Sequence, residues 1–431
     1  MNSETLKYVK ENFGVDPDIV DTVEAAEMAL SGAFSRLDGI MEYNQYKVLK
    51  KFQDARINDQ HFAWNTGYGY DDIGRAALEQ LYADVFGAEA GLVRPTIVNG
   101  THALASVYFG LLRPGDELIY CSGDPYDTMQ TVIGIKGNAA GSLKEFGVLY
   151  RQVDLLPGNE IDIEGVKKAI GPKTKVVALQ RSRGYSFRNA FTIDQIEAWV
   201  RACRDVRPDV ICMVDNCYGE FTDIKEPVQV GADIMAGSLI KNPGGGIAVS
   251  GGYIVGRKDL VDIVANRVTC PGIGGECGLT FGQTRNMFQG FFIAPRVTNG
   301  AVKGAALCAK VFADLGYEVC PGPEDAKNDI VEAVKLGSPE AVCAFCEGVQ
   351  AAAPIDAYVK PIPWDMPGYT DQVIMAAGAF IGGSSIELSA DAPMREPYTV
   401  YFQGGITYEH SKFGVMKALQ ALKDAGCLAK Q

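Results

Sequence analysis

Short apolar runs alternate with amphipathic stretches through the middle of the chain, from about residue 75 to residue 257. The apolar runs, each predicted to form a strand, are ELIYCS (117–122), VLYRQVDL (148–155), KVVALQ (175–180), VICMVDN (210–216), DIMAGSL (233–239) and GYIVGR (252–257). Helices are predicted between most of them, at 101–112, 126–135, 161–170 and 193–206. Such alternation is typical of an α/β fold with a largely parallel sheet covered on both faces. Because ligands of these sheets bind at the carboxyl ends of the strands, polar residues just past those ends are the first candidates for a site.

The pattern differs at both ends of the chain. Residues 1–60 are predicted to form a helical segment, because 17–31 and 42–56 carry apolar residues at three-to-four spacing. After about residue 300 we expect helices at 298–315, 325–336, 339–351 and 410–425, and strands at 317–320, 372–380, 384–388 and 398–403. The predicted organisation is an N-terminal helical segment (1–60), a large α/β domain (61–300) and a smaller C-terminal α+β domain (301–431).

Composition and charge exclude several classes of protein. The 431 residues include 40 Lys and Arg against 53 Asp and Glu, a net charge of −13, whereas a nucleic-acid binder needs a basic face. Only three histidines are present, which disfavours zinc hydrolases and Ser-His-Asp enzymes.

The eleven cysteines are odd in number and no signal peptide is evident, so we expect reduced thiols in a cytoplasmic protein. No metal site is predicted, because the C-x-x-C at 343–346 has no partner at zinc spacing. No membrane span is predicted either, since the longest uncharged run (95–112) contains polar residues.

Three features at predicted strand ends carry candidate chemistry. Asp215 ends the run VICMVDN, although a lone strand-terminal Asp is more often a turn cap. Lys241 follows another strand in GSLIKNPGGG, where a desolvated amine could form a covalent bond with a carbonyl, and the segment is no P-loop. Gly100 and Thr101 open a helix in NGTHA, which could bind an anion at its backbone N–H groups or could be a simple helix cap.

The order of these features is more informative than any one of them. An anion-binding turn comes first, then Tyr126 in SGDPYDT, then Asp215 and Lys241. This order matches enzymes of fold type I that use pyridoxal 5′-phosphate. In those enzymes the turn holds the phosphate, the aromatic ring stacks on the cofactor, the Asp pairs with the pyridine nitrogen, and the Lys bonds covalently to the cofactor.

The full set of motifs resembles the cystathionine and methionine lyase superfamily. The motifs are GYGYDDIGRAALEQLYADVFGAEAGLV, NGTHA, LLRPGDELIY, DPYDT, VVALQRS, MVDNCYGE, GADIMAGSLIKNPGGGIAVSGGYIVG and GSSIELSADAPMREPYTVYFQGGITYEHSKFG. They are most similar to the branch called the methionine gamma-lyase family or aluminium resistance protein, over roughly residues 60 to 425. The resemblance implies a fold type I transferase fold: a large, mostly parallel sheet domain of the seven-stranded type and a smaller C-terminal domain.

The resemblance also implies roles for individual residues. Lys241 would carry the cofactor, Asp215 would pair with the pyridine nitrogen, and Tyr126 would stack on the ring and protonate a departing thiolate. The phosphate would be bound by Gly100, Thr101 and Ser238, while His102 could stack over the ring. Tyr68 or Tyr70 resembles the tyrosine that reaches the phosphate of a neighbouring subunit, which implies a homodimer or homotetramer with shared active sites.

The sequence departs from the superfamily at several of these motifs. Ile240 replaces a phosphate-binding hydroxyl, and Tyr68–Gly69–Tyr70 lacks the usual arginine, for which Arg75 and Arg285 are the candidate substitutes. Arg181 and Arg183 stand where neutral groups are usual. These changes leave the substrate more open than the cofactor.

We therefore expect a pyridoxal phosphate-dependent carbon–sulfur lyase that acts on a sulfur-containing amino acid by β- or γ-elimination. Lys241 would remove the Cα proton, which requires a depressed pKa. Arg395 or Arg183 would bind the substrate carboxylate, because a guanidinium matches its two oxygens. Cys217 and Glu220 lie beside motif residues and are expected only to shape the pocket. Alternatives are an aminotransferase, an aldolase or a γ-replacement enzyme on the same scaffold, a regulatory protein without activity, and a nicotinamide-dependent Rossmann enzyme, which the missing G-x-G-x-x-G disfavours.

Overall fold

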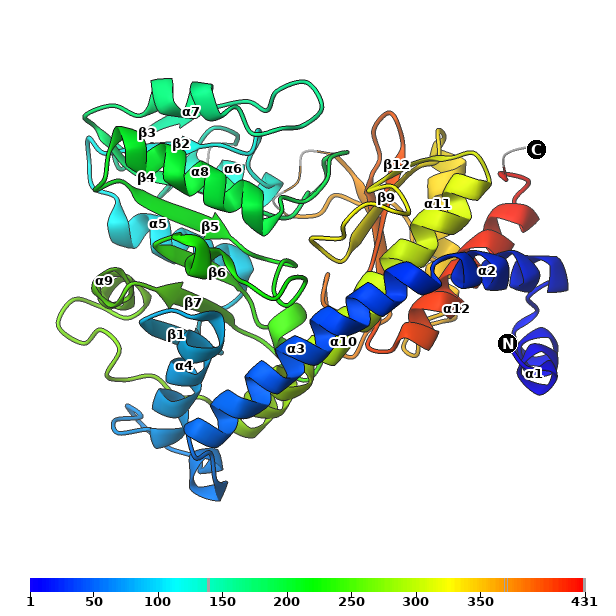
Figure 1. The fold of residues 1–431 in the computed structure, drawn as a ribbon, viewed down its shortest axis with the longest axis horizontal. Helices are drawn as coiled ribbons and strands as arrows, with labels where there is room; N and C mark the ends of the chain where they lie inside the picture. The colour runs from blue at the N-terminus through cyan, green and yellow to red at the C-terminus, as the bar shows by residue number, and fades with distance from the viewer. Residues whose placement is uncertain (138–139, 368, 370, 429–431) are drawn as a thin grey trace. The chain divides into compact units, whose positions relative to one another are not determined.

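The computed structural model describes residues 1–137, 140–367, 369 and 371–428 (Figure 1). The chain divides into two compact units. The large unit comprises Tyr43–Gly184 and Arg188–Pro295, and the small unit comprises Met1–Glu42, Tyr185–Phe187 and Arg296–Gln431. The unit boundaries near residues 42 and 295 fall within two long helices, α3 (Ser31–Asp54) and α10 (Thr284–Asp314).

The large unit is built on a seven-stranded, mostly parallel sheet with the order β1-β7-β6-β5-β4-β2-β3. Its strands are β1 (Ala90–Arg94), β2 (Glu117–Tyr120), β3 (Leu149–Gln152), β4 (Thr174–Gln180), β5 (Ile211–Asp215), β6 (Ile234–Ser238) and β7 (Gly252–Gly256). Only β7 runs antiparallel to its neighbours, β1 and β6. The large unit therefore confirms the predicted α/β class.

Helices lie on both faces of this sheet (Figure 1). They are α4 (Ile73–Phe86), α5 (Gly100–Leu111), α6 (Asp127–Ile133), α7 (Ile163–Ala169), α8 (Ile193–Val206) and α9 (Lys258–Val268), with short 3-10 turns η1 (Asp59–Phe62), η2 (Pro227–Val230) and η3 (Asn242–Gly244). Side-chain caps explain several of their starts, such as Thr192 and Gln195, which form a capping box at α8.

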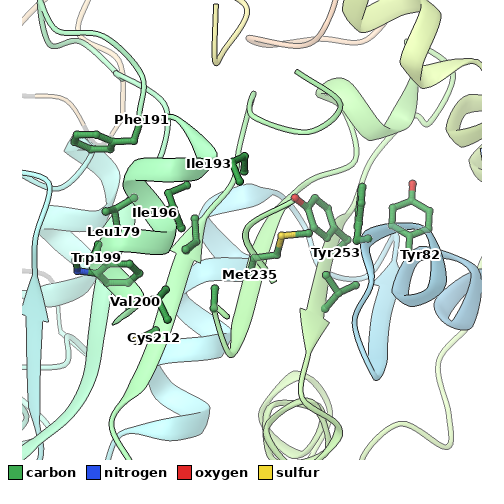
Figure 2. Close-up of a cluster of buried hydrophobic side chains, with 14 of the residues drawn as sticks. Tyr82, Leu179, Phe191, Ile193, Ile196, Trp199, Val200, Cys212, Met235 and Tyr253 are labelled. Carbon is green, nitrogen blue, oxygen red and sulfur yellow. The ribbon is translucent and has the colours of Figure 1, made fainter. Parts of the chain in front are cut away.

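Side chains from successive strand positions enter two separate cores. Val177 and Leu179 of β4 pack in one hydrophobic cluster, whereas Val176 and Ala178 pack in the other. Figure 2 shows part of the first cluster, in which Trp199 and Ile196 of α8 lie close to Leu179. Each large apolar side chain buried in this way stabilises the fold by about 1.5–3 kcal/mol. Burial on both faces is why these strands read as continuous apolar runs in the sequence.

The small unit contains an antiparallel sheet with the order β10-β11-β12-β9-β8. Its strands are β8 (Glu318–Cys320), β9 (Val331–Lys335), β10 (Val373–Ala376), β11 (Ser389–Pro393) and β12 (Thr399–Gln403), and its other helices are α1 (Ser3–Phe13), α2 (Pro17–Ala29), α11 (Pro339–Ala351) and α12 (Tyr408–Asp424). The predicted helix 325–336 is wrong, because VEAVK forms β9 and pairs with both β8 and β12. The predicted strand 384–388 is also wrong, since the strand begins at Ser389.

All eleven cysteines are free thiols. Cys343 and Cys346 lie on α11, and no group of three or more metal-ligating side chains occurs among the described residues. In the described part of the chain, no helix is both long and apolar enough to cross a membrane.

Candidate active site

Three predicted motifs meet at the carboxyl-end edge of the large sheet. Gln180, the last residue of β4, is paired in register with Asp215, the last residue of β5. The next strand, β6, ends at Ser238, three residues before Lys241. A Cβ placed on Gly100, at the start of α5, would lie 3.3 Å from both Cys217 Sγ and Ser238 Cβ. The structure therefore brings the start of α5 next to the loops that follow β5 and β6, although more than 100 residues separate Gly100 from Cys217 and Ser238.

The start of α5 offers backbone donors toward this edge. Asn99 caps the helix, and its side-chain oxygen accepts a hydrogen bond from the backbone N–H of His102 at 2.8 Å. The first N–H groups of a helix have no partner within the helix, so those of Gly100 and Thr101 are suited to an anion. The hydroxyl of Thr101 is 2.9 Å from that of Thr128 on α6, which ties the two helix starts together.

Asp215 is a buried carboxyl group at this edge. It is 4% exposed, and its Oδ1 accepts a hydrogen bond from the backbone N–H of Cys217 at 3.1 Å. Burial raises the pKa of Asp215, although the hydrogen bonds from Cys217 and the charge of Lys241 act in the opposite direction. A cationic partner placed against this carboxylate would restore its charged form.

Lys241 lies directly before η3, and its amine rests on an aromatic ring. Its Nζ is 3.5 Å from the centroid of the Tyr218 ring. Burial by itself would lower the pKa of Lys241, but interactions with Tyr218, Cys217 and Asp215 outweigh it and raise the pKa above the ordinary value. Without the cofactor, the amine of Lys241 is therefore protonated at neutral pH. The depressed pKa expected of the amine that is freed during the reaction stays a prediction.

Tyr126 is held at the start of α6. Its backbone N–H donates to Gln180 Oε1 at 3.1 Å, which links it to the end of β4. A Cβ on Gly184 would lie 2.9 Å from Gln180 Nε2 and 3.1 Å from Tyr126 Cδ2, so glycine at that position leaves room for both side chains. His102 is also fixed, because its Nδ1 accepts a hydrogen bond from the backbone N–H of Val98 at 3.0 Å. Burial and the nearby Arg267 lower the pKa of His102, so its ring is neutral.

Tyr68 and Tyr70 lie on an exposed loop of the large unit. Their side chains are 74% and 58% exposed, and their ring centroids are 5.5 Å apart. Arg75 holds this loop, since its guanidinium donates to the carbonyl oxygens of Gly69 at 2.7 Å, Gly278 at 2.7 Å and Glu276 at 2.9 Å. Arg75 is thus committed to backbone carbonyls, and Arg285 stacks over the Phe62 ring at 4.3 Å.

A family model described as methionine gamma-lyase matches residues 19–423. The chain belongs to the methionine gamma-lyase family. This membership confirms the predicted family and the predicted class of enzyme, a pyridoxal phosphate-dependent carbon–sulfur lyase.

Several similar proteins match this chain over nearly its whole length. Uncharacterized protein YnbB of Bacillus subtilis (strain 168) is 48% identical over 402 residues, which are 93% of this chain and 96% of that protein. A crystal structure from Clostridium acetobutylicum, provisionally described as a cystathionine beta-lyase involved in aluminum resistance, is 46% identical with a TM-score of 0.94 and covers 98% of this chain and 100% of that one. A carbon-sulfur lyase involved in aluminum resistance from Clostridium novyi NT is 48% identical with a TM-score of 0.93, covering 97% and 99% of the two chains.

The three arginines singled out in this lyase have different environments. Arg181 is fully buried and donates to Asn216 Oδ1 at 3.0 Å, to the Gly219 carbonyl at 2.8 Å and to Thr222 Oγ1 at 3.1 Å, so it supports the loop after β5. Arg183, 1% exposed, follows the end of β4 by three residues. Arg395, in the small unit, is exposed and forms an ion pair with Asp371 at 2.7 Å.

Sequence reasoning missed two residues of the site. Tyr218 was not considered, and Asn242 was passed over, although its fully buried amide Nδ2 donates to the carbonyl oxygens of Tyr218 at 3.0 Å and Glu220 at 2.9 Å. Both sit next to recognised motif residues in VDNCYGE and SLIKN, but their roles depend on contacts between the two loops. Glu220, expected to shape the pocket, is fully buried and accepts a hydrogen bond from the Tyr253 hydroxyl at 2.7 Å.

Proposed function

We propose that this lyase acts on a sulfur-containing amino acid by β- or γ-elimination and releases a thiol, ammonia and a 2-oxo acid. The observation that carries the proposal is the meeting of a glycine-opened helix start, the buried carboxyl of Asp215 and the amine of Lys241 at one sheet edge. An anion-binding turn, an acid and an amine in one place are the parts that a phosphate-bearing aldehyde cofactor needs.

The residues present fit pyridoxal phosphate. Gly100 leaves open a space that a Cβ would fill, beside the backbone donors of α5 and the hydroxyl of Ser238. If buried Asp215 faces the pyridine nitrogen, the protonated nitrogen is the cation that stabilises its carboxylate. Lys241 supplies the amine for the covalent bond. When bound, the cofactor supplies an electron-withdrawing ring that stabilises negative charge at the substrate Cα.

The chain's own residues handle the protons and the substrate carboxylate. In its neutral form, the amine of Lys241 takes the Cα proton of the substrate and becomes the ammonium that its neighbours stabilise. Tyr126 donates a phenolic proton to the departing sulfur. Arg183 binds the substrate carboxylate, because it is buried beside the site's strand ends whereas the guanidinium of Arg395 is engaged by Asp371.

A neighbouring copy of the chain completes the site in this proposal. Tyr68 and Tyr70 are exposed and presented together by a loop that Arg75 braces. A phenol from this loop would reach the phosphate held by another subunit, in a homodimer or homotetramer. Mixing an inactive Lys241→Ala chain with an inactive Tyr68→Phe/Tyr70→Phe chain should then restore part of the activity.

The test is a screen of amino acids with the purified protein and added cofactor. Cystathionine, methionine and cysteine are incubated with the protein, and 2-oxo acid, ammonia and thiol are measured together. The proposal expects equal amounts of all three products, and a yellow protein that absorbs near ~420 nm. Formation of 2-oxo acid only when an acceptor 2-oxo acid is added, without thiol, would instead establish an aminotransferase. A protein that takes up no cofactor would overturn the proposal.

A further inference from the structure

The face of the Tyr218 ring is in contact with the amine proposed to carry the cofactor. Nζ of Lys241 lies 3.5 Å from the ring centroid, well inside the range of about 6 Å for a cation–π interaction. Tyr218 is 8% exposed, so little water competes for the ammonium on this side. Ring faces attract cations more strongly when the pair is desolvated.

The backbone of Tyr218 is held in a costly conformation. Its φ is +69°, a left-handed value that residues other than Gly, Asn and Asp adopt rarely. Strain of this kind persists only where the surroundings enforce it. Here the enforcing group is Asn242, the residue after Lys241, whose amide binds the carbonyls of Tyr218 and Glu220. The lysine's own turn thus fixes the position of the ring.

We propose that Tyr218 is a positioning residue that receives the Lys241 ammonium whenever this lysine is not bonded to the cofactor. The inference rests on the proposed function, because it assigns a resting place to the lysine of that site. The ring face favours the charged amine over the neutral one, so it keeps the free lysine protonated and in place. Asp215 and Cys217 also face the amine and act in the same direction. Buried Glu220 adds to them only where it is ionised, above its pKa of about 8.

The chemical reactivity of Lys241 tests this proposal without any catalytic turnover. The full-length protein, freed of cofactor, is treated with a small excess of acetic anhydride at pH values from 7 to 10, and acetylation of Lys241 is measured by mass spectrometry. The exposed Lys7 in the same digest serves as the internal reference. Only the neutral amine reacts, and the pKa of Lys241 lies above this pH range, so the rate of Lys241 acetylation relative to Lys7 reports the fraction of neutral amine.

Two substitutions separate the ring face from the hydroxyl. Tyr218→Phe keeps the ring and should leave the relative rate within about twofold of wild type. Tyr218→Leu removes the ring and should raise the relative rate roughly tenfold, as expected when the pKa of Lys241 falls by about one unit. Tyr218→Asn tolerates the left-handed backbone and should raise the rate in the same way if the leucine variant does not fold. An unchanged rate in Tyr218→Leu, or an equal increase in Tyr218→Phe, would overturn the proposal. The acetylation rates do not depend on lyase activity. A negative result for Tyr218 would therefore leave the proposed reaction standing, and a failure to detect the reaction would leave the role of Tyr218 standing.

Discussion

Replacing Glu220 with Gln should change how the stability of this lyase depends on pH. Glu220 is fully buried, its Oε1 accepts from the Tyr253 hydroxyl at 2.7 Å, and its Oε2 has no hydrogen-bond partner among the described residues. Burial raises the pKa of Glu220 to about 8, against 4.5 in water, even though the hydrogen bond from Tyr253 and the charge of Lys241 lower it. The carboxyl group is therefore protonated and neutral at pH 7 in the folded protein.

The size of the effect follows from that difference. The folded state binds the proton of Glu220 about 3.5 units more tightly than the unfolded state (8 minus 4.5), and each unit is worth about 1.36 kcal/mol. This contribution to stability is fully present below pH 4.5 and is lost as the pH rises through 8, by about 5 kcal/mol in total. Between pH 6 and pH 8 alone, wild type should lose about 2 kcal/mol relative to Glu220→Gln, whose amide does not titrate.

Urea unfolding followed by circular dichroism at pH 6, 7 and 8 measures this difference. The control is Glu324→Gln, which removes an exposed carboxylate from the same chain. It should leave the gap to wild type constant within about 0.5 kcal/mol. If the stability of wild type relative to Glu220→Gln stays constant with pH, or decreases as the pH falls, the assignment of a proton to buried Glu220 is refuted.

Four further results are expected. Lys241→Ala should leave the fold intact but remove the covalent attachment of the cofactor, which mass spectrometry after borohydride reduction would show as a missing adduct. Gly100→Ala should weaken cofactor binding by roughly tenfold, about 1.4 kcal/mol, because its Cβ would come within 3.3 Å of Cys217 Sγ and Ser238 Cβ. Dialysis against graded cofactor concentrations measures the affinity, and an unchanged value would count against Gly100 as part of the phosphate-binding turn. Asp215→Asn should reduce kcat by about 100-fold or more while the protein still binds cofactor, as steady-state kinetics would show. Arg183→Lys should raise KM for the amino acid by about tenfold or more, whereas Arg395→Lys should change it by less than about threefold, and the opposite ranking would assign the carboxylate to Arg395.

The fold of the large unit was predictable because its strands are buried on both faces. Residues such as Val176 and Val177 enter different cores, so the strands appear as apolar runs whose ends the sequence marks with polar residues. The small unit was harder to predict. VEAVK in β9 carries Val, Ala and Glu in a pattern that suits either a helix or a strand, and only pairing with β8 and β12 decides between them.

The same limit applies to the site. Asp215, Lys241 and Gly100 were recognisable from their order along the chain and their places at strand and helix ends. The contact between Lys241 and Tyr218 was not, because it depends on the left-handed turn after β5 and on Asn242 reaching across from the next loop. The neighbours that raise the pKa of Lys241 without cofactor were not predictable either, because the sequence does not place Tyr218 and Cys217 against its amine.

The bond from Asn242 to the backbone of Tyr218 has a consequence for local unfolding. If η3 opens, the turn after β5 loses the group that holds its strained residue, and that turn should relax at once. The amides around Tyr218 and those around Asn242 should therefore exchange with deuterium in a single opening event, with one free energy, although they belong to different loops. Loss of cofactor and loosening of both loops would then be the same event, so the lifetime of the bound cofactor would report how often this small region opens.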